Sequence, residues 1–104
     1  MKYEKLLFSV KQGSVEWSVH ALRNMLERGI SRDAVLQIIE HGEIIELYDD
    51  DTPYPSALFL GYWKERPLHS VIAYDDNNGV VFIITAYEPD EEHFEPDWRT
   101  RRNK

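Results

Sequence analysis

Two mostly apolar stretches near the middle of the chain carry three polar side chains that could take part in chemistry. The stretches cover residues 68–74 and 80–87, and the polar residues are His69, Thr85 and Tyr87. Imidazole titrates near neutral pH, so His69 is suited to taking or giving a proton in catalysis. Burying an imidazole costs free energy unless it is hydrogen-bonded, and a structural bond to the backbone is the commonest explanation for such a residue. His69 is therefore compatible with a catalytic or a structural role, whereas Thr85 and Tyr87 are common in strands and are interpreted as structural before they are interpreted as site residues.

A second polar set follows one side of a predicted helix over residues 19–28. Its members are His20, Arg23 and Arg28, and guanidinium groups beside an imidazole can bind a phosphate or a carboxylate. The alternative is an ordinary solvated helix surface, on which Arg28 also interacts favourably with the helix C-terminus. The two sets together give the candidate site: the catalytic candidates are His20, His69 and Tyr87, and the substrate-binding candidates are Arg23, Arg28 and Thr85.

Other kinds of reactive site have no matching pattern in the sequence. The four histidines are scattered, without a His-x-x-x-His pair, and there is no cysteine, so we expect neither a bound metal nor a disulfide. There is no glycine-rich phosphate loop and no nucleophile elbow, and we expect no cofactor. The acidic run over residues 88–92 lacks the glycine-bearing loop that calcium coordination uses, so we interpret it as a solvated turn.

Whether His69 and Tyr87 meet depends on the turn that joins the two stretches. The intervening residues 75–79, Asp-Asp-Asn-Asn-Gly, are typical of a β-hairpin. A two-residue turn at the end of this segment points His69 away from Tyr87. A three-residue loop with Gly79 in the left-handed conformation places His69 opposite Tyr87 instead.

We favour the three-residue loop because it gathers the polar groups on one face of the hairpin. It pairs Asp76 with Val80, and Val71 with Thr85. The other face is then left to pack against helices, and its residues are Ile72, Tyr74, Phe82 and Ile84.

Three helices are predicted before the hairpin. Residues 2–12 carry apolar side chains at helical spacing and are followed by a glycine. Ser18 and Ser31 are suitable N-caps for helices over residues 19–28 and 32–41, each of which is followed by a glycine. The expected buried stripes of these two helices are Val19, Leu22, Met25 and Leu26 in the first, and Val35, Ile38 and Ile39 in the second.

Strands are predicted after residue 42, where the hydrophobic period changes. Residues 43–48 and 57–63 alternate, and the hairpin follows, which gives an α+β fold with two or three N-terminal helices packed on a four-stranded antiparallel sheet. The chain is expected to be a single domain: 1–17 form a helix and linker, 18–90 the core, and 91–104 a charged tail. In that tail Phe94 and Trp98 would cover the sheet edge, and the basic end consists of Arg99, Arg101, Arg102 and Lys104.

Composition limits the class of protein. The chain has 104 residues, and its 12 basic against 19 acidic residues give a net charge of −7. An acidic chain is not typical of tight, nonspecific nucleic-acid binders, because phosphate contacts need a basic surface. We expect a cytoplasmic protein without membrane association, since no apolar run approaches the length of a membrane span and the N-terminus does not resemble a signal peptide. The sequence does not determine the oligomeric state.

An ordered set of short motifs resembles the bacterial family DUF4258. The motifs, found between about Trp17 and Arg102, are His20-Ala21 with Met25, Arg28-Gly29-Ile30-Ser31, Gly42-Glu43-Ile44-Ile45-Glu46, Pro67-Leu68-His69 and Ile84-Thr85-Ala86-Tyr87-Glu88-Pro89-Asp90. No single motif is specific, but their order and spacing together are. That family is similar to the RelE/ParE-like and BrnT-like toxins of type II toxin–antitoxin pairs, which are small proteins with helices followed by an antiparallel sheet.

The resemblance implies a toxin-like domain that cleaves RNA without a metal, with a small antitoxin protein as partner and RNA or the ribosome as target. Such cleavage needs a base, an acid and cations on the phosphate. The resemblance then makes His20 and His69 the acid and base in either order, Arg23 and Arg28 the phosphate ligands, and Tyr87 and Thr85 the orienting groups. The alternative is a non-catalytic module of the same fold that binds a protein, or a small anion at His20, Arg28 and His69.

Overall fold

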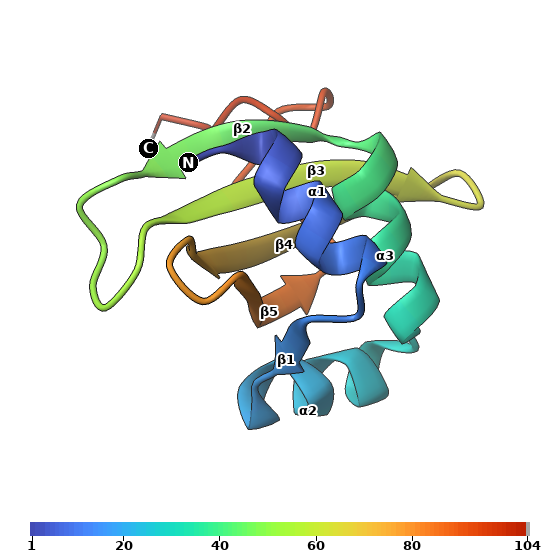
Figure 1. Ribbon diagram of the computed structural model, residues 1–104. Coiled ribbons are helices and arrows are strands. Elements are labelled where there is room, and N and C mark those ends of the chain that lie inside the picture. The colour runs from blue at the N-terminus through green and yellow to red at the C-terminus, as the bar shows by residue number, and fades with distance from the viewer. Residues whose placement is uncertain (104) are drawn as a thin grey trace.

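The computed structural model describes residues 1–103, which form three helices and five strands (Figure 1). The helices are α1 (Tyr3–Lys11), α2 (Val19–Arg28) and α3 (Arg32–His41), and the strands are β1 (Val15–Trp17), β2 (Glu43–Tyr48), β3 (Ser56–Trp63), β4 (Arg66–Asp75) and β5 (Val80–Tyr87). The expected α+β class with N-terminal helices is confirmed. Lys104, the last residue of the predicted basic end, lies outside the described residues.

Local capping explains why α2 and α3 begin and end at the expected residues. The Ser18 hydroxyl accepts a hydrogen bond from the Ala21 amide at 2.9 Å, and the Ser31 hydroxyl accepts one from the Ala34 amide at 3.0 Å. Each bond satisfies an amide that the first helical turn leaves without a partner. Gly29 ends α2 in the left-handed conformation, with φ at 64°, which glycine adopts at little cost.

The sheet differs from the expected four-stranded antiparallel meander. Its strand order is β1-β5-β4-β3-β2, and the first pair is parallel, with Val15 opposite Val81 and Trp17 opposite Ile83. The remaining pairs are antiparallel. The additional strand was missed because β1 has three residues, which are too few for an alternating pattern to be recognised.

The hairpin of β4 and β5 reaches the expected pairing through an unexpected turn. His69 lies opposite Tyr87, and Val71 opposite Thr85, as predicted. However, Asp75 rather than Asp76 lies opposite Val80, so the loop is one residue longer than expected. An irregularity on β5 between Ile83 and Thr85 compensates for the shift.

The longer loop changes which residues of β5 face the helices, up to the bulge. Ile72 and Tyr74 are buried as predicted, but Val81 and Ile83 join them, and Phe82 and Ile84 do not. Ile84 is 40% exposed, while Phe82 stacks on Tyr54 from the loop after β2, with ring centroids 5.4 Å apart. The prediction for Phe82 and Ile84 was wrong because the longer loop shifts the pairing of residues 80–83 by one, which turns Phe82 to the outer side. Ile84 is the extra residue of the bulge that restores the expected register.

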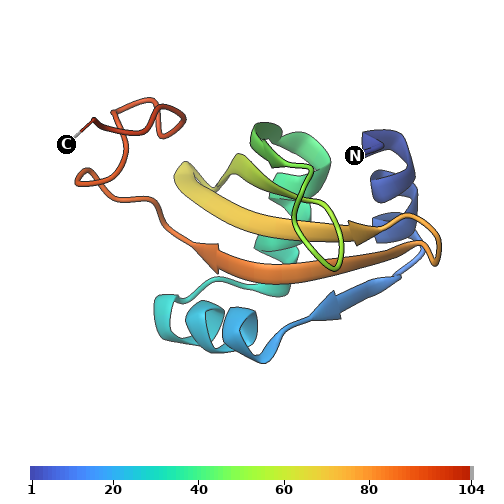
Figure 2. The same cartoon turned by 90° about the vertical axis from the view of Figure 1, so that its left-hand side faces the viewer.

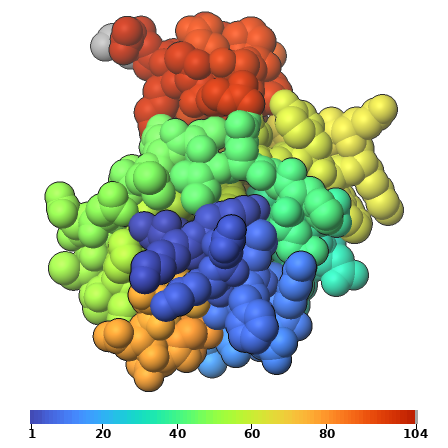
Figure 3. Space-filling model, turned by 45° about the horizontal axis from the view of Figure 1, so that its top comes forward, coloured from blue at the N-terminus to red at the C-terminus, as the bar shows by residue number. Residues whose placement is uncertain are grey.

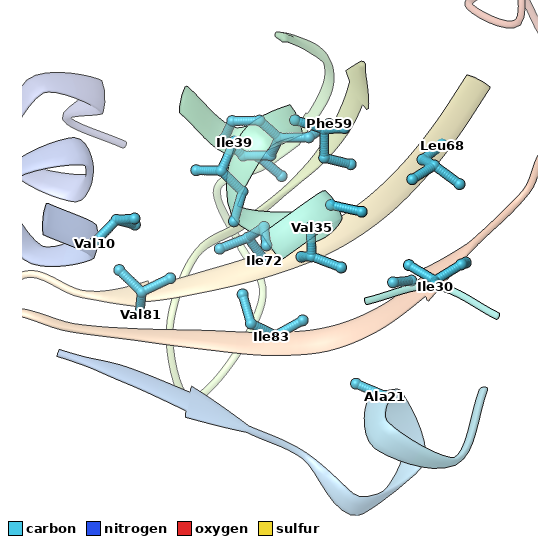
Figure 4. Close-up of a cluster of buried hydrophobic side chains, with 14 of the residues drawn as sticks. Val10, Ala21, Ile30, Val35, Ile39, Phe59, Leu68, Ile72, Val81 and Ile83 are labelled. Atoms are coloured by element: carbon cyan, nitrogen blue, oxygen red, sulfur yellow. The ribbon is translucent and has the colours of Figure 1, made fainter. Parts of the chain in front are cut away.

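The hydrophobic core lies between the sheet and the helices α1 and α3 (Figures 1 and 4). Helix α1 contributes Leu6 and Val10, and the centre of β3 contributes Phe59. The other labelled side chains of Figure 4 belong to the same buried cluster, namely Ala21, Ile30, Val35, Ile39, Leu68, Ile72, Val81 and Ile83. We call the opposite side of the sheet the outer face.

Helix α2 buries a narrower stripe than expected. Ala21 and Met25 are buried, whereas Val19 and Leu26 are 71% and 85% exposed. The helix packs beside β5 at the end of the sheet (Figure 2), where it meets one strand and therefore needs only part of the predicted apolar stripe. The result is an uncovered apolar strip on α2.

The outer face is partly covered by two segments without regular structure. The loop before β3 places Tyr54 over Phe82, and the chain beyond β5 packs against His69 through Phe94. In Figure 3 these last residues form a separate lobe beside β2. None of the helices within residues 1–103 is both long and apolar enough for a membrane span.

Candidate functional site

His69 lies at the centre of a polar cluster on the outer face and has no exposed surface. Its Nε2 is 2.6 Å from the Trp98 backbone oxygen, and its Nδ1 is 3.2 Å from the Tyr87 hydroxyl. Because a carbonyl oxygen only accepts hydrogen bonds, Nε2 carries the proton. Nδ1 of the neutral ring then accepts the bond from Tyr87. The structural bond to the backbone considered for His69 is thus present.

The cluster extends from His69 to the edge strand β2. Glu46 accepts two hydrogen bonds from Arg101, at 2.7 Å from Nε and 3.1 Å from the terminal nitrogen, and a third from the Tyr48 hydroxyl. Such two-pronged bonds fix the relative orientation of a guanidinium and a carboxylate. We call Glu46, Tyr48, His69, Tyr87 and Arg101 the outer-face cluster.

Phe94 joins the two halves of the cluster. Its ring packs edge-on against the His69 imidazole at a centroid distance of 4.6 Å, and the Arg101 guanidinium lies 5.0 Å from the centre of the same ring. Phe94 is 3% exposed. The apolar ring therefore excludes water from the imidazole and holds the arginine over the sheet.

Burial and charge set the protonation states of the cluster. Burial lowers the pKa of His69 below its ordinary value, and the nearby Arg101 lowers it further, against the opposing effects of the Trp98 carbonyl and Glu46. The hydrogen bond from Arg101 lowers the pKa of Glu46, while burial raises the pKa of both Tyr48 and Tyr87. At neutral pH the cluster thus holds a neutral imidazole, an ionised carboxylate, two neutral phenols and a guanidinium.

The lowered pKa of His69 predicts that the protein loses stability as the pH falls from about 7 to about 5. The unfolded chain binds a proton near the ordinary value of 6.5, but the folded chain does not until a lower pH, so the unfolded state binds more protons in this window. This contribution to the unfolding free energy is complete above about pH 6.5 and is lost as the pH falls toward the pKa of the folded state. The unfolding free energy changes by at most about 1.4 kcal/mol per pH unit in this window. Urea denaturation at several pH values measures this slope.

His69→Gln is the matched variant for this measurement, because it keeps a polar side chain at the site without a titrating ring. Its unfolding free energy should vary less with pH than that of the wild type across the same window. Equal slopes in the two proteins would contradict the assignment to His69.

The structure places the predicted catalytic residues in two groups. His69 and Tyr87 are in direct contact, whereas His20 is exposed on α2 and its Nε2 is hydrogen-bonded to Asn24 at 3.1 Å. Asn24 in turn donates to the Thr85 hydroxyl at 3.1 Å. Thr85 therefore ties α2 to β5, and no hydrogen bond within residues 1–103 joins His20 to His69.

The predicted phosphate ligands Arg23 and Arg28 are exposed on α2. The Arg28 carbonyl accepts a hydrogen bond from Arg66 at 2.7 Å, so the backbone of Arg28 holds the start of β4. A shared anion on His20, Arg28 and His69 is not supported by this arrangement, because both ring nitrogens of His69 are already hydrogen-bonded within the protein.

Three members of the cluster were not predicted as site residues from the sequence. Glu46 and Tyr48 are two residues apart on β2, so their side chains leave the same face of the sheet, and this alternation was a usable signal. Arg101 was noted only as part of a basic end. Its pairing with Glu46 joins segments far apart in the chain, which a local pattern does not indicate.

Within residues 1–103, no group of three or more acidic, histidine or cysteine side chains is arranged to hold a metal ion. Glu46 instead has Arg101 as its cationic partner.

Comparison with known proteins identifies the family of the chain. No curated protein and no solved structure matches it. The model of a domain of unknown function, DUF4258, matches residues 17–88. This range includes all three strands that carry Glu46, Tyr48, His69 and Tyr87, and it ends before the segment that carries Phe94 and Arg101. The chain belongs to the DUF4258 family.

Proposed function

We propose that this protein is a toxin-like, metal-independent endoribonuclease with a RelE/ParE-like fold, and that the outer-face cluster is its active site. The observation that carries the proposal is that Glu46, Tyr48, His69, Tyr87 and Arg101 meet in one place on the sheet. A carboxylate, an imidazole, a guanidinium and phenols are the groups that RNA transesterification needs when no metal takes part.

The protonation states suggest a division of roles. Glu46 is ionised, so it can take the proton of a 2′-hydroxyl as the 2′-oxygen forms its bond to phosphorus. The bond from phosphorus to the 5′-oxygen then breaks, and that oxygen needs a proton. We assign this proton to His69, which takes one up when water reaches the ring, because burial is the main cause of its lowered pKa. Tyr87 orients His69, and Arg101, once released from Glu46, supplies positive charge for the phosphate.

Incubation of the purified protein with single-stranded RNA and, separately, with ribosomes carrying messenger RNA tests this proposal. We expect cleavage in the presence of EDTA, with a 2′,3′-cyclic phosphate on one product and a 5′-hydroxyl on the other. Absence of cleavage on both substrates, or products that end in a 5′-phosphate, would contradict the assignment.

A second candidate function is a protein-binding module, and the exposed apolar strip of α2 favours it. Val19 and Leu26 are 71% and 85% exposed, and large apolar side chains that share a helix face are typical of helix-mediated recognition. The partner proposed here is a small antitoxin protein encoded beside this chain. The two functions are compatible, since the strip and the cluster use different residues.

For this partner we expect Leu26→Glu to weaken binding by about thirty-fold or more, as for a central apolar contact that becomes charged. Co-expression with the product of the adjacent gene, followed by co-purification and titration calorimetry, measures the change. Leu47→Glu is the matched control, because Leu47 is 54% exposed on β2. Equal affinities of the two variants would exclude α2 as the binding surface.

A further inference from the structure

We propose that the C-terminal segment, residues 90–102, is an autoinhibitory plug. It covers the strand residues of the outer-face cluster, and it opens when its arginines lose their carboxylate partners, which also frees Arg101 for a phosphate. The proposal rests on the function assigned above and adds its regulation. It also concerns a part of the chain that lies beyond the family match, which ends at residue 88.

The plug occupies the positions that a substrate needs. The Trp98 carbonyl takes the hydrogen bond of His69 Nε2, and the Phe94 ring covers the imidazole. His69 consequently has no exposed surface. A 5′-oxygen could receive a proton from this ring only after Trp98 and Phe94 have moved away.

Ion pairs that salt can screen hold the plug on the sheet. Arg101 pairs with Glu46, and Arg99 pairs with Glu43, while the arginine side chains are 55% and 51% exposed. Pairs that reach the surface are screened by salt. The Arg99–Glu43 pair is exposed on both sides and contributes little, while the two-pronged Arg101–Glu46 pair, whose carboxylate is 23% exposed, is the stronger one. Phe94 is the only buried residue among residues 90–102, so the segment has one buried apolar anchor beside the hydrogen bond between His69 and the Trp98 carbonyl.

The segment also has internal structure, which lets it move as a unit. Phe94 and Arg101 form an isolated antiparallel bridge, and the Glu95 amide donates to the Thr100 carbonyl at 2.8 Å. The Asp97 carboxylate accepts bonds from the Arg99 and Thr100 amides, each at 2.9 Å. These bonds do not involve the sheet, so they persist when the plug lifts.

Chemical labelling of histidine tests the plug in the intact protein. Diethyl pyrocarbonate modifies accessible imidazoles, and peptide mass spectrometry gives a rate for each site. The exposed His20 and His41 serve as internal references. In the wild type at low salt, His69 should be labelled far more slowly than either reference.

The double variant Arg99→Ala/Arg101→Ala removes both ion pairs from the plug. An exposed ion pair changes the equilibrium between the closed and the open plug by a factor of about five at most. Since the variant removes two pairs, we expect the His69 labelling rate to rise by about tenfold. The matched control is Lys5→Ala/Lys11→Ala, which removes the same charge from α1 and should leave the rate unchanged. Circular dichroism confirms that both variants keep the fold.

A salt titration of the wild type gives an independent measurement that needs no substitution. The His69 rate should rise between about 0.05 and 0.5 M NaCl, while the rates of His20 and His41 change little. In the double variant this salt dependence should be lost, because the pairs that salt screens are absent.

The outcomes separate the plug from the proposed function. The plug proposal is contradicted if His69 in the wild type is labelled as fast as His20 and His41. It is also contradicted if the double variant and the wild type at high salt protect His69 as well as the wild type does at low salt. If the single variant Arg99→Ala, which keeps Arg101, labels His69 faster than the wild type but cleaves no RNA, the plug is supported and the ribonuclease assignment is contradicted.

Discussion

Phe59→Ala is expected to lower the free energy of unfolding by about 3–5 kcal/mol, which is the usual cost of truncating a fully buried phenylalanine. Phe59 has no exposed surface and lies at the centre of β3, opposite Ile44 on one side and Ser70 on the other. Its ring stacks on Tyr3 of α1 at a centroid distance of 6.2 Å. The truncation leaves a cavity that neither the sheet nor the helix can fill, because both are anchored on either side of it.

Urea denaturation followed by circular dichroism measures this loss. Phe8→Ala is the matched control, because it removes the same ring from an α1 position that is 65% exposed. Its unfolding free energy should stay within about 0.5 kcal/mol of the wild type. Similar losses in the two variants would mean that the core does not lie between α1 and the centre of the sheet.

The helices could be predicted from the sequence because their signals are local. Ser18 and Ser31 cap helices that begin one residue later, as expected. The exposure of Val19 and Leu26 could not be predicted in the same way. A helical wheel shows which residues are apolar, but it does not show how much sheet is available to cover them.

The sheet was predicted less completely, for reasons that are not local. The parallel pairing of β1 with β5 joins residues 15–17 to residues 81–83, which are far apart in the chain. Nothing in Val15–Trp17 indicates that partner. The bulge near Ile84 lies in an apolar run, so an apolar side chain faces the helices in either register. The contact of His69 with Tyr87 was therefore expected from a turn that the protein does not have.

The candidate site shows the same limit. The alternation of Glu46 and Tyr48 on β2 was readable, as was the presence of a polar ring at His69 within an apolar strand. Their meeting requires β3 to lie between β2 and β4 and the C-terminal segment to fold back over all three. Arg101 joins the cluster only through that fold, and His20 is kept outside it by the position of α2.

We expect His69→Gln and Glu46→Gln each to lower the rate of RNA cleavage by about 10²–10⁴-fold, because each removes a group that transfers a proton in the transition state. Glutamine retains hydrogen-bonding capacity at both sites but cannot exchange a proton near neutral pH. Single-turnover cleavage of a labelled RNA, in which binding is saturated, measures the chemical step separately from affinity.

His93→Gln is the matched control, because His93 belongs to the C-terminal segment but its ring faces solvent, where it bonds Asp90 at 2.7 Å. Its rate should equal that of the wild type. If Glu46 is the base and His69 the acid, the wild-type rate should also pass through a maximum with pH. His69→Gln should lose the decline in rate on the alkaline side, where the acid loses its proton. Glu46→Gln should lose the decline on the acid side, where the base becomes protonated. A reversed pattern would exchange the two roles, and unchanged rates in both variants would place the chemistry outside the cluster.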